Sequence, residues 1–276
     1  MTARSKSVTP ASVLTAVTGL RASAGQTRTL VVSGPPGLVQ ILVRDVTRGG
    51  VSAAVREHGP LEGAAALVHI LAGPPGDDDL RLFGEAARRR LPVVAVIPSA
   101  ADVAGHLPYV LDENVVRVRG GAGFPLEEIA QRLARALGES ATPLAARLPV
   151  LRAAVCEELI RRFSRRNGVI GAVVFVPGAD MPILTLNQIR LVLRIADAHG
   201  FEIDRERIPE VLAVIGSAFG FRALARKTIG LVPLVGWAVK GGVAYTGTRA
   251  IGEAAVRYFE GRAPVTRVAG ERVRFP

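Results

Sequence analysis

The clearest chemical pattern in the chain is Gly-Pro-Pro-Gly-Leu-Val-Gln-Ile, residues 34–41, which directly follows a strand-like apolar run. Its position and length are those of a phosphate-binding loop, where two glycines, a lysine and a hydroxyl residue occupy fixed places. Gly34 fits the first place, whereas Val39, Gln40 and Ile41 replace the second glycine, the lysine and the hydroxyl. The missing lysine and hydroxyl would hold the β/γ-phosphates and Mg²⁺. The segment therefore predicts a nucleotide-type loop that has lost its nucleotide chemistry.

We take Gly34, Gly37 and Gln40 as the residues of this degenerate phosphate loop and expect no bound cofactor. Weak anion binding by backbone N–H groups stays open, because the start of a helix favours negative charge. A second interpretation also stays open, in which the glycines and prolines form a simple turn without any GTPase ancestry.

Two further GTPase motifs are also degraded at their expected places. The guanine-reading N-K-x-D should follow the apolar run 92–97, but residues 98–101 read Pro-Ser-Ala-Ala, and Asp102 is one place off. The D-x-x-G motif aligns with Arg56 and Gly59, which places a positive charge where Mg²⁺ needs a carboxylate. Three separate losses favour a diverged GTPase-like domain that no longer hydrolyses GTP.

Charge is unevenly distributed along the 276 residues, whose net charge is +11. Residues 51–150 carry ten basic and twelve acidic side chains, whereas residues 151–276 carry nineteen basic and eleven acidic ones. A basic C-terminal half indicates an anionic partner, phospholipid or nucleic acid. An arginine-rich, alanine-rich composition is also typical of a high-GC genome, so the charge alone does not identify the partner.

Cysteine and histidine usage argues against disulfide and metal chemistry. Cys156 is the single cysteine, which excludes an intrachain disulfide and fits a reducing compartment. The four histidines are scattered, without the spacing of a metal site. No apolar segment follows the basic N-terminus at signal-peptide distance, so we expect a protein that is not exported.

Alternating strand and helix patterns predict an α/β domain with a parallel sheet over residues 28–140, after an N-terminal extension, 1–27. The predicted strands are 30–32, 64–71, 92–97 and 115–118, and the predicted helices are 38–46, 77–90 and 125–137. Asp77, Asp78 and Asp79 suit the positive end of the second helix, and Gly138 suits the end of the third.

After a short predicted linker, 141–143, the alternation stops, and residues 147–260 predict an all-α, glycine-rich, hydrophobic domain followed by a basic tail, 261–276. The expected helices are 147–164, 184–199, 205–219 and 248–259, with a possible short helix at 222–227. Cys156 lies among apolar neighbours and is expected to be a buried packing residue.

Residues 165–190, RRNGVIGAVVFVPGADMPILTLNQIR, combine an apolar run, a Pro-Gly-Ala-Asp turn and a Leu-Thr-x-x-Gln helix. This order, with the later Phe-Gly-Phe-Arg at 219–222 and Val-Pro-Leu-Val-Gly-Trp at 232–237, resembles the YcjF-type domain of unknown function of bacteria. The resemblance covers roughly 110 residues. It implies a membrane-associated domain, often fused to or encoded beside Era-like or dynamin-like GTPases, and it implies no particular reaction.

Two apolar segments, Gly168–Leu186 and Gly230–Gly247, approach the length of about 20 residues that a membrane span needs. Asp180 and Lys240 interrupt them, and a charge at mid-bilayer costs roughly 2.5–3.5 kcal/mol. One alternative is a pair of short, closely packed helices in which Asp180 and Lys240 pair. The other is a soluble bundle in which both segments form the core.

The residues singled out in this half for membrane or partner binding are Pro177, Gly178, Asp180, Pro182, Gln188, Arg190, Trp237 and Lys240. Each also has a structural interpretation. Asp180 suits a turn or helix cap, and Arg190 suits an ion pair with a nearby acid more than a lipid headgroup. Lys240 either extends its amine to water or meets an acid.

These patterns favour a non-enzymatic, membrane-associated scaffold or regulatory protein with a pseudo-GTPase-like domain, at the cytoplasmic face of the bacterial inner membrane. Its expected partners are anionic lipid or a membrane-embedded protein, together with an intact GTPase, and glycine-rich helices invite self-association. The alternatives are a GTP-binding protein or hydrolase with divergent motifs, and a cytoplasmic helical partner-binding protein. Nucleic-acid binding is disfavoured because aromatic residues are few and no reading motif is present.

Overall fold

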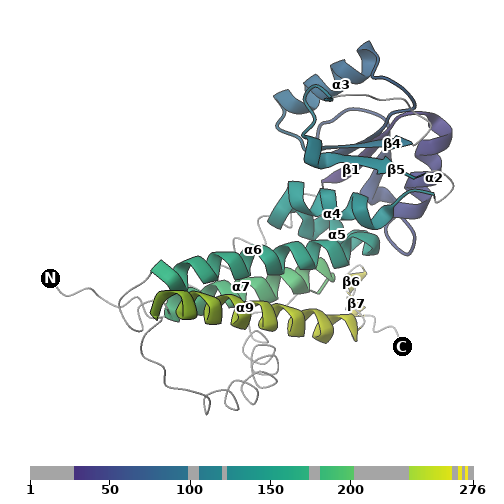
Figure 1. Ribbon diagram of the computed structural model, residues 1–276. Helices are drawn as coiled ribbons and strands as arrows, with labels where there is room; N and C mark the ends of the chain where they lie inside the picture. The colour runs from purple at the N-terminus through teal and green to yellow at the C-terminus, as the bar shows by residue number, and fades with distance from the viewer. Residues whose placement is uncertain are drawn as a thin grey trace. The chain divides into compact units, whose positions relative to one another are not determined.

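The computed structural model describes residues 28–98, 106–119, 123–173, 181–201, 236–262, 267–268 and 271–272. Contacts divide the chain into two compact units, one within Gln26–Glu158 and the other from Leu159 onward. The first unit is a parallel sheet with helices, and the second is helical (Figure 1). The predicted order, an α/β part followed by an α part, is confirmed at this level.

The sheet of the first unit has five parallel strands in the order β2-β1-β3-β4-β5. Their bounds are β1 Thr29–Ser33, β2 Val55–Glu57, β3 Ala64–Ile70, β4 Val93–Pro98 and β5 Val115–Val118. In such open sheets, ligands bind beyond the carboxyl ends of the strands, where the strand order reverses. Here that point lies between β1 and β3.

Helices cover both faces of the sheet. The helices are α2 Pro36–Val46, α3 Asp77–Arg88 and α4 Leu126–Leu137. The chain crosses from β1 to β2 in one direction and from β3 to β4 in the other, so right-handed connections place α2 and α3 on opposite faces (Figure 1). Every residue of β3 is consequently buried, which explains why its sequence is apolar except for His69.

The edge strand β2 was not predicted. It contains only Val55, Arg56 and Glu57, and its burial falls from one end to the other. Three residues of mixed polarity carry no readable period, so only pairing with β1 identifies this segment as a strand.

The connection between sheet and helical unit differs from the prediction. Residues 141–143, predicted as a linker, are helical and part of η3 Gly138–Ala141 and α5 Thr142–Arg147. A helix was predicted from residue 147, but the 3-10 turn η4 Pro149–Leu151 intervenes and α6 Arg152–Val173 follows. Pro149 explains the break, because proline lacks an N–H donor and forces the residue before it to be extended.

The described part of the second unit has three long helices that run side by side (Figure 1). They are the part of α6 from Leu159, α7 Met181–Ala198 and α9 Gly236–Glu260. The predicted helix 184–199 ending at Gly200 is confirmed in outline. The last helix starts twelve residues earlier than predicted. Two short strands, β6 Arg267–Val268 and β7 Glu271–Arg272, pair antiparallel. The predicted helices 205–219 and 222–227 lie outside the described residues.

Small residues allow α9 to approach α6 closely. The buried positions of α9 recur every seven residues. They form two series, one of Gly241, Thr248 and Ala255 and the other of Gly252 and Phe259. A Cβ at Gly241 would lie 2.8 Å from the Gly168 carbonyl oxygen, and one at Gly252 would lie 2.6 Å from Ile160 Cγ1. The glycines therefore set the separation of the two helices.

Adjacent glycines of α9 provide a matched test of this packing. G241A places a methyl group against the α6 backbone, so we expect it to lower the free energy of unfolding by about 1–3 kcal/mol. G242A meets no atom within 4 Å and should stabilise the helix by about 0.5–1 kcal/mol. Urea unfolding measures both, and equal effects of the two substitutions would contradict the close contact.

Candidate functional site

The β1–α2 turn is too short to surround a phosphate. β1 ends at Ser33 and α2 begins at Pro36, so the segment predicted to be a degenerate loop is already helical from its third residue. Val39, at the second glycine position, is fully buried in the core, and Gln40, at the lysine position, is exposed on the helix. The polypeptide here forms a tight strand-to-helix connection rather than a phosphate-binding loop.

The hydrogen-bond donors of this turn are also depleted. Pro35 and Pro36 carry no N–H, and the N–H groups of Leu38 and Val39 both donate to the Pro35 carbonyl oxygen at 3.0 Å. A phosphate-binding turn works by directing several such donors at one anion. The arrangement therefore supports helix initiation, for which proline at the first position is well suited.

Gly34 has a packing role. Its φ of 130° is favoured only by glycine, and a Cβ there would overlap the backbone carbonyl oxygen of Ile70 on β3. Gly37 is exposed, with open space where a Cβ would be. The first glycine of the motif is therefore explained by close approach of the chain to β3, without reference to a nucleotide.

Arg56 lies at the opposite end of the strands from the β1–α2 turn. Its Nε donates to the Thr29 hydroxyl and its Nη2 to the Glu62 carbonyl oxygen, both at 2.8 Å. Thr29 opens β1 and Glu62 precedes β3, so the guanidinium lies beside the amino ends of these strands. The prediction that Arg56 stands in the place of a Mg²⁺-binding carboxylate is therefore wrong in its geometry.

A serine–histidine–aspartate chain, in which Ser33 and His69 are buried and Asp79 is half-buried, joins the carboxyl ends of β1 and β3 to α3. Ser33 Oγ lies 2.7 Å from His69 Nδ1, and His69 Nε2 lies 2.8 Å from Asp79 Oδ1. The other oxygen of Asp79 accepts the Gly76 N–H at 2.9 Å, which caps the start of α3. The three side chains thus form one continuous relay at the place where the strand order reverses.

The direction of the hydrogen bonds follows from the chemistry of the three groups. A carboxylate only accepts, so Nε2 of His69 carries the proton and Nδ1 accepts from the Ser33 hydroxyl. Burial lowers the pKa of His69 below its ordinary value of 6.5, and the hydrogen bond to Asp79 opposes that shift in part. Phe83 packs edge-on against the imidazole, with ring centroids 5.2 Å apart. The histidine is therefore held neutral.

This relay has the residue types of a nucleophile system, but its environment is that of a structural tie. Ser33 and His69 are buried in the sheet layer, and neither described cavity of the α/β unit includes them. The sequence analysis missed the relay because the histidines are scattered. The available signal was the position of Ser33 and His69 at the ends of two predicted strands.

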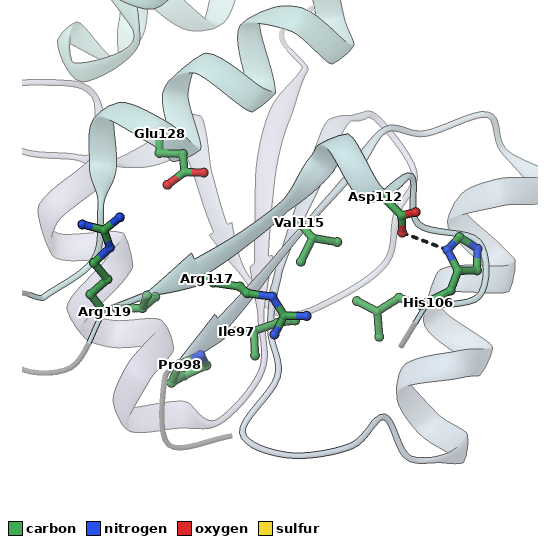
Figure 2. A pocket seen from close by; sticks show the side chains of 10 residues that line it. Ile97, Pro98, His106, Asp112, Val115, Arg117, Arg119 and Glu128 are labelled. Carbon is green, nitrogen blue, oxygen red and sulfur yellow. Dashed lines mark hydrogen bonds and ion pairs between the residues drawn. The ribbon is translucent and has the colours of Figure 1, made fainter. Parts of the chain in front are cut away.

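The largest described cavity of this unit has a volume of about 800 Å³ and opens at the carboxyl ends of β4 and β5 (Figure 2). It occupies the place where a guanine-reading motif was sought. Figure 2 shows Arg117 directed across its middle, with the bonded pair His106 and Asp112 on one side. The two described carboxylates that line it, Asp112 and Glu128, are bonded to His106 and Arg132. The described wall therefore offers no unpaired carboxylate for a guanine ring.

A buried polar layer crosses the helical unit and is formed by Asn167, Asn187, Gln188 and Thr248 (hereafter the polar layer). Asn167 Nδ2 donates to the Thr248 hydroxyl at 2.8 Å, and Asn187 Nδ2 donates to Asn167 Oδ1 at 2.8 Å. Gln188 Nε2 lies 3.3 Å from the same hydroxyl, which itself bonds the Ala244 carbonyl oxygen. One layer thus links α6, α7 and α9 at a single level.

Sequence reasoning identified one member of this layer, Gln188, through the resemblance. It missed Asn167, Asn187 and Thr248, because single polar residues inside amphipathic helices resemble ordinary surface positions. One turn before Asn167 on α6, the hydroxyl of Ser164 is buried and has no hydrogen-bond partner in the structure.

The structure places the other predicted residues as follows. Arg190 is half-buried on α7, one turn after Asn187. Pro182 lies in the first turn of α7, and Trp237 and Lys240 lie in the first turns of α9. Pro177, Gly178 and Asp180 lie outside the described residues, so the proposed pair of Asp180 with Lys240 does too.

The apolar stretch Gly168–Leu186 is not one straight helix. Asn167 Nδ2 lies 3.5 Å from the carbonyl oxygen of Leu184, although 17 residues of α-helix would separate these positions by roughly 25 Å. Its ends therefore belong to two helices that fold back on each other. Within the described residues, no helix combines the length and the apolarity that crossing a bilayer requires.

Comparisons of the chain with known protein families, with curated proteins and with solved structures found no match. Within the described residues, no cluster of histidine, cysteine or acidic side chains has the arrangement of a metal site.

His69 predicts a pH dependence of stability. Because its pKa is lower in the folded state, the unfolded chain binds more protons below pH 6.5, so the free energy of unfolding falls as the pH drops through that value. H69Q should show a smaller fall than the wild type in urea unfolding at pH 7.5 and 5.5. H106Q, which removes an exposed histidine, is the control and should behave as the wild type does.

Two threonines of α9 test the polar layer. Both hydroxyls bond the carbonyl oxygen four residues earlier, but Thr248 is fully buried and accepts from Asn167, whereas Thr246 is exposed. T248V leaves a buried amide without its partner and should cost about 1–3 kcal/mol in the free energy of unfolding. T246V should change it by less than about 0.5 kcal/mol. A similar small effect for both variants would show that the cross-helix bonds are weak.

Proposed function

We propose that this chain is a non-enzymatic scaffold or regulatory protein that acts at the cytoplasmic face of the bacterial inner membrane. The observation that carries the non-enzymatic part is the β1–α2 turn, where helix α2 begins at Pro36 and Val39 is buried in the core. A phosphate cannot be wrapped by a two-residue connection that is poor in N–H donors. The α/β unit then serves to bind a partner rather than to turn over a nucleotide.

A diverged GTPase-like origin of the α/β unit, and a YcjF-type origin of the helical unit, form part of this proposal. Support comes from a five-stranded parallel sheet with helices on both faces. The partner that fits this history is an intact GTPase, which would supply the nucleotide chemistry that this chain lacks. Self-association through the glycine-rich helices is a further expectation.

The membrane part rests on the charge of the helical unit. Arg162, Arg165 and Arg166 are exposed on α6. Each basic residue near an anionic lipid surface contributes about 1 kcal/mol of attraction, which salt screens. We therefore expect anionic phospholipid to be the first ligand of this unit.

Two alternatives remain distinct from this proposal. A GTP-binding protein or hydrolase with divergent motifs would need phosphate contacts that the turn at Gly34 and Pro35 does not offer. A cytoplasmic helical partner-binding protein would use the same helices and show no affinity for lipid.

One pair of binding measurements separates these functions. We expect no GTP binding by titration calorimetry with Mg²⁺, and sedimentation with phosphatidylglycerol vesicles but not with phosphatidylcholine vesicles. R165E/R166E should weaken vesicle binding by about thirtyfold or more, because two attractions of about 1 kcal/mol each are lost and the reversed charges add repulsion. R44E/R48E makes the same change of charge on two exposed arginines of the α/β unit, Arg44 in α2 and Arg48 just after it, and should have little effect.

Binding of GTP would favour the hydrolase alternative. Equal sedimentation of both double variants would show that net charge, rather than the α6 surface, determines membrane attraction. No sedimentation of the wild type with either vesicle would leave the helical partner-binding protein as the better description.

A further inference from the structure

The polar layer separates two ends of the helical unit that differ in chemistry. On one side lie residues 168–173 of α6, 181–186 of α7 and 236–247 of α9, here called the apolar tip. Lys240 is the one charged residue in these three ranges. On the other side, the same helices carry many charges, including the ion pair between Arg249 and Glu253 at 2.8 Å.

Exposed apolar side chains gather at the apolar tip. Within the described helical unit, the large apolar residues that are mostly exposed are Val169, Val173, Ile183 and Val243, with 49–65% of their surface accessible. All four belong to the tip, and they come from all three helices. A cluster of this kind, contributed by neighbouring helices, marks an interaction surface rather than isolated surface residues.

Arginines surround the unit at the level where the tip begins. Arg165 and Arg166 directly precede Asn167 on α6, Arg190 follows Asn187 by three residues on α7, and Arg249 follows Thr248 on α9. Because Asn167, Asn187 and Thr248 are hydrogen-bonded to one another, these arginines lie within roughly 5 Å of one level along the helix axes. We call these four residues the arginine collar.

The distances along the helices match the depth of a membrane interface. Val169 lies two residues beyond the polar layer and Val173 six residues beyond it, which places the exposed valines roughly 3–9 Å past the collar at 1.5 Å per residue. Helices that bind in the interface bury their apolar side about 5–10 Å into the headgroup and acyl boundary. The collar would then lie among the anionic headgroups.

We infer that the apolar tip inserts into the outer part of an anionic bilayer while the arginine collar binds lipid phosphates and limits the depth. This inference rests on the proposed function and specifies its contact surface. Neutral apolar partners fit the collar poorly, because its exposed Arg165 and Arg166 favour an anionic surface, while Arg249 is already paired with Glu253. The helices do not cross the membrane in this arrangement.

The test uses tryptophan fluorescence with vesicles of phosphatidylglycerol brominated on the acyl chains. Trp237 is the single tryptophan of the chain and is first replaced by phenylalanine. V243W then reports from the tip. R257W, fourteen residues further on α9, reports from nearly the same side of the helix, roughly 21 Å away. We expect quenching of V243W to exceed that of R257W by about twofold or more, because only the tip reaches the acyl boundary.

A second measurement keeps the native tryptophan. V243E places a charge in the tip and should weaken sedimentation with phosphatidylglycerol vesicles by about tenfold. V51E makes the same substitution at an exposed valine of the α/β unit and should leave sedimentation unchanged. Circular dichroism confirms that each variant is folded before it is compared.

The outcomes distinguish this inference from the proposed function. If the wild type does not bind anionic vesicles, the proposed function fails and the inference with it. If the wild type binds but V243W and R257W are quenched equally, the membrane function stands and insertion of the tip is overturned. If V243E instead abolishes a dimer seen by light scattering while V243W stays unquenched, the tip belongs to a second copy of the chain, which also overturns it.

Discussion

The side-chain amide of Asn167 is the contact on which the helical unit depends. It donates to Thr248 on α9 and accepts from Asn187 on α7, so one fully buried group fixes the relative levels of three helices. A shift of any helix by one turn would remove at least one partner of this amide in a low-dielectric interior, where each unmet hydrogen bond is costly. The glycine contacts then bring α6 and α9 close together at relative levels that the hydrogen bonds of Asn167 already fix. Polar specificity and close packing therefore support each other in this bundle.

A different constraint governs the α/β unit, where the backbone of Gly34 passes directly against Ile70 of β3. This approach brings the start of α2 close to the sheet and places Ser33 beside His69. The buried relay that results ties two strands and the first turn of α3 together. At the strand-order reversal, where other α/β proteins bind ligands, Ser33, His69 and Asp79 of this protein bond to one another.

The general layout could be predicted from the sequence because hydrophobic periodicity is a local property. The apolar run at 64–71 and the acidic start of the helix at Asp77 identify their elements without tertiary information. The strand at Val55 was missed because it depends on pairing with β1, whereas the break at Pro149 has a local signal, the proline itself, that the sequence analysis did not use. The residues of the polar layer were harder to predict from the sequence. Asn167 and Thr248 are 81 residues apart, and only the fold brings them together.

The same separation has a consequence for how the protein is made. Translation proceeds at about 5–20 residues per second, so on the order of 4–16 seconds pass between the synthesis of Asn167 and that of Thr248. During that time α6 and α7 exist without the helix that covers their polar layer. Nascent chains in this state expose apolar surface beside the ribosome and are prone to aggregate. The helical unit therefore completes its packing only after α9 has been synthesised.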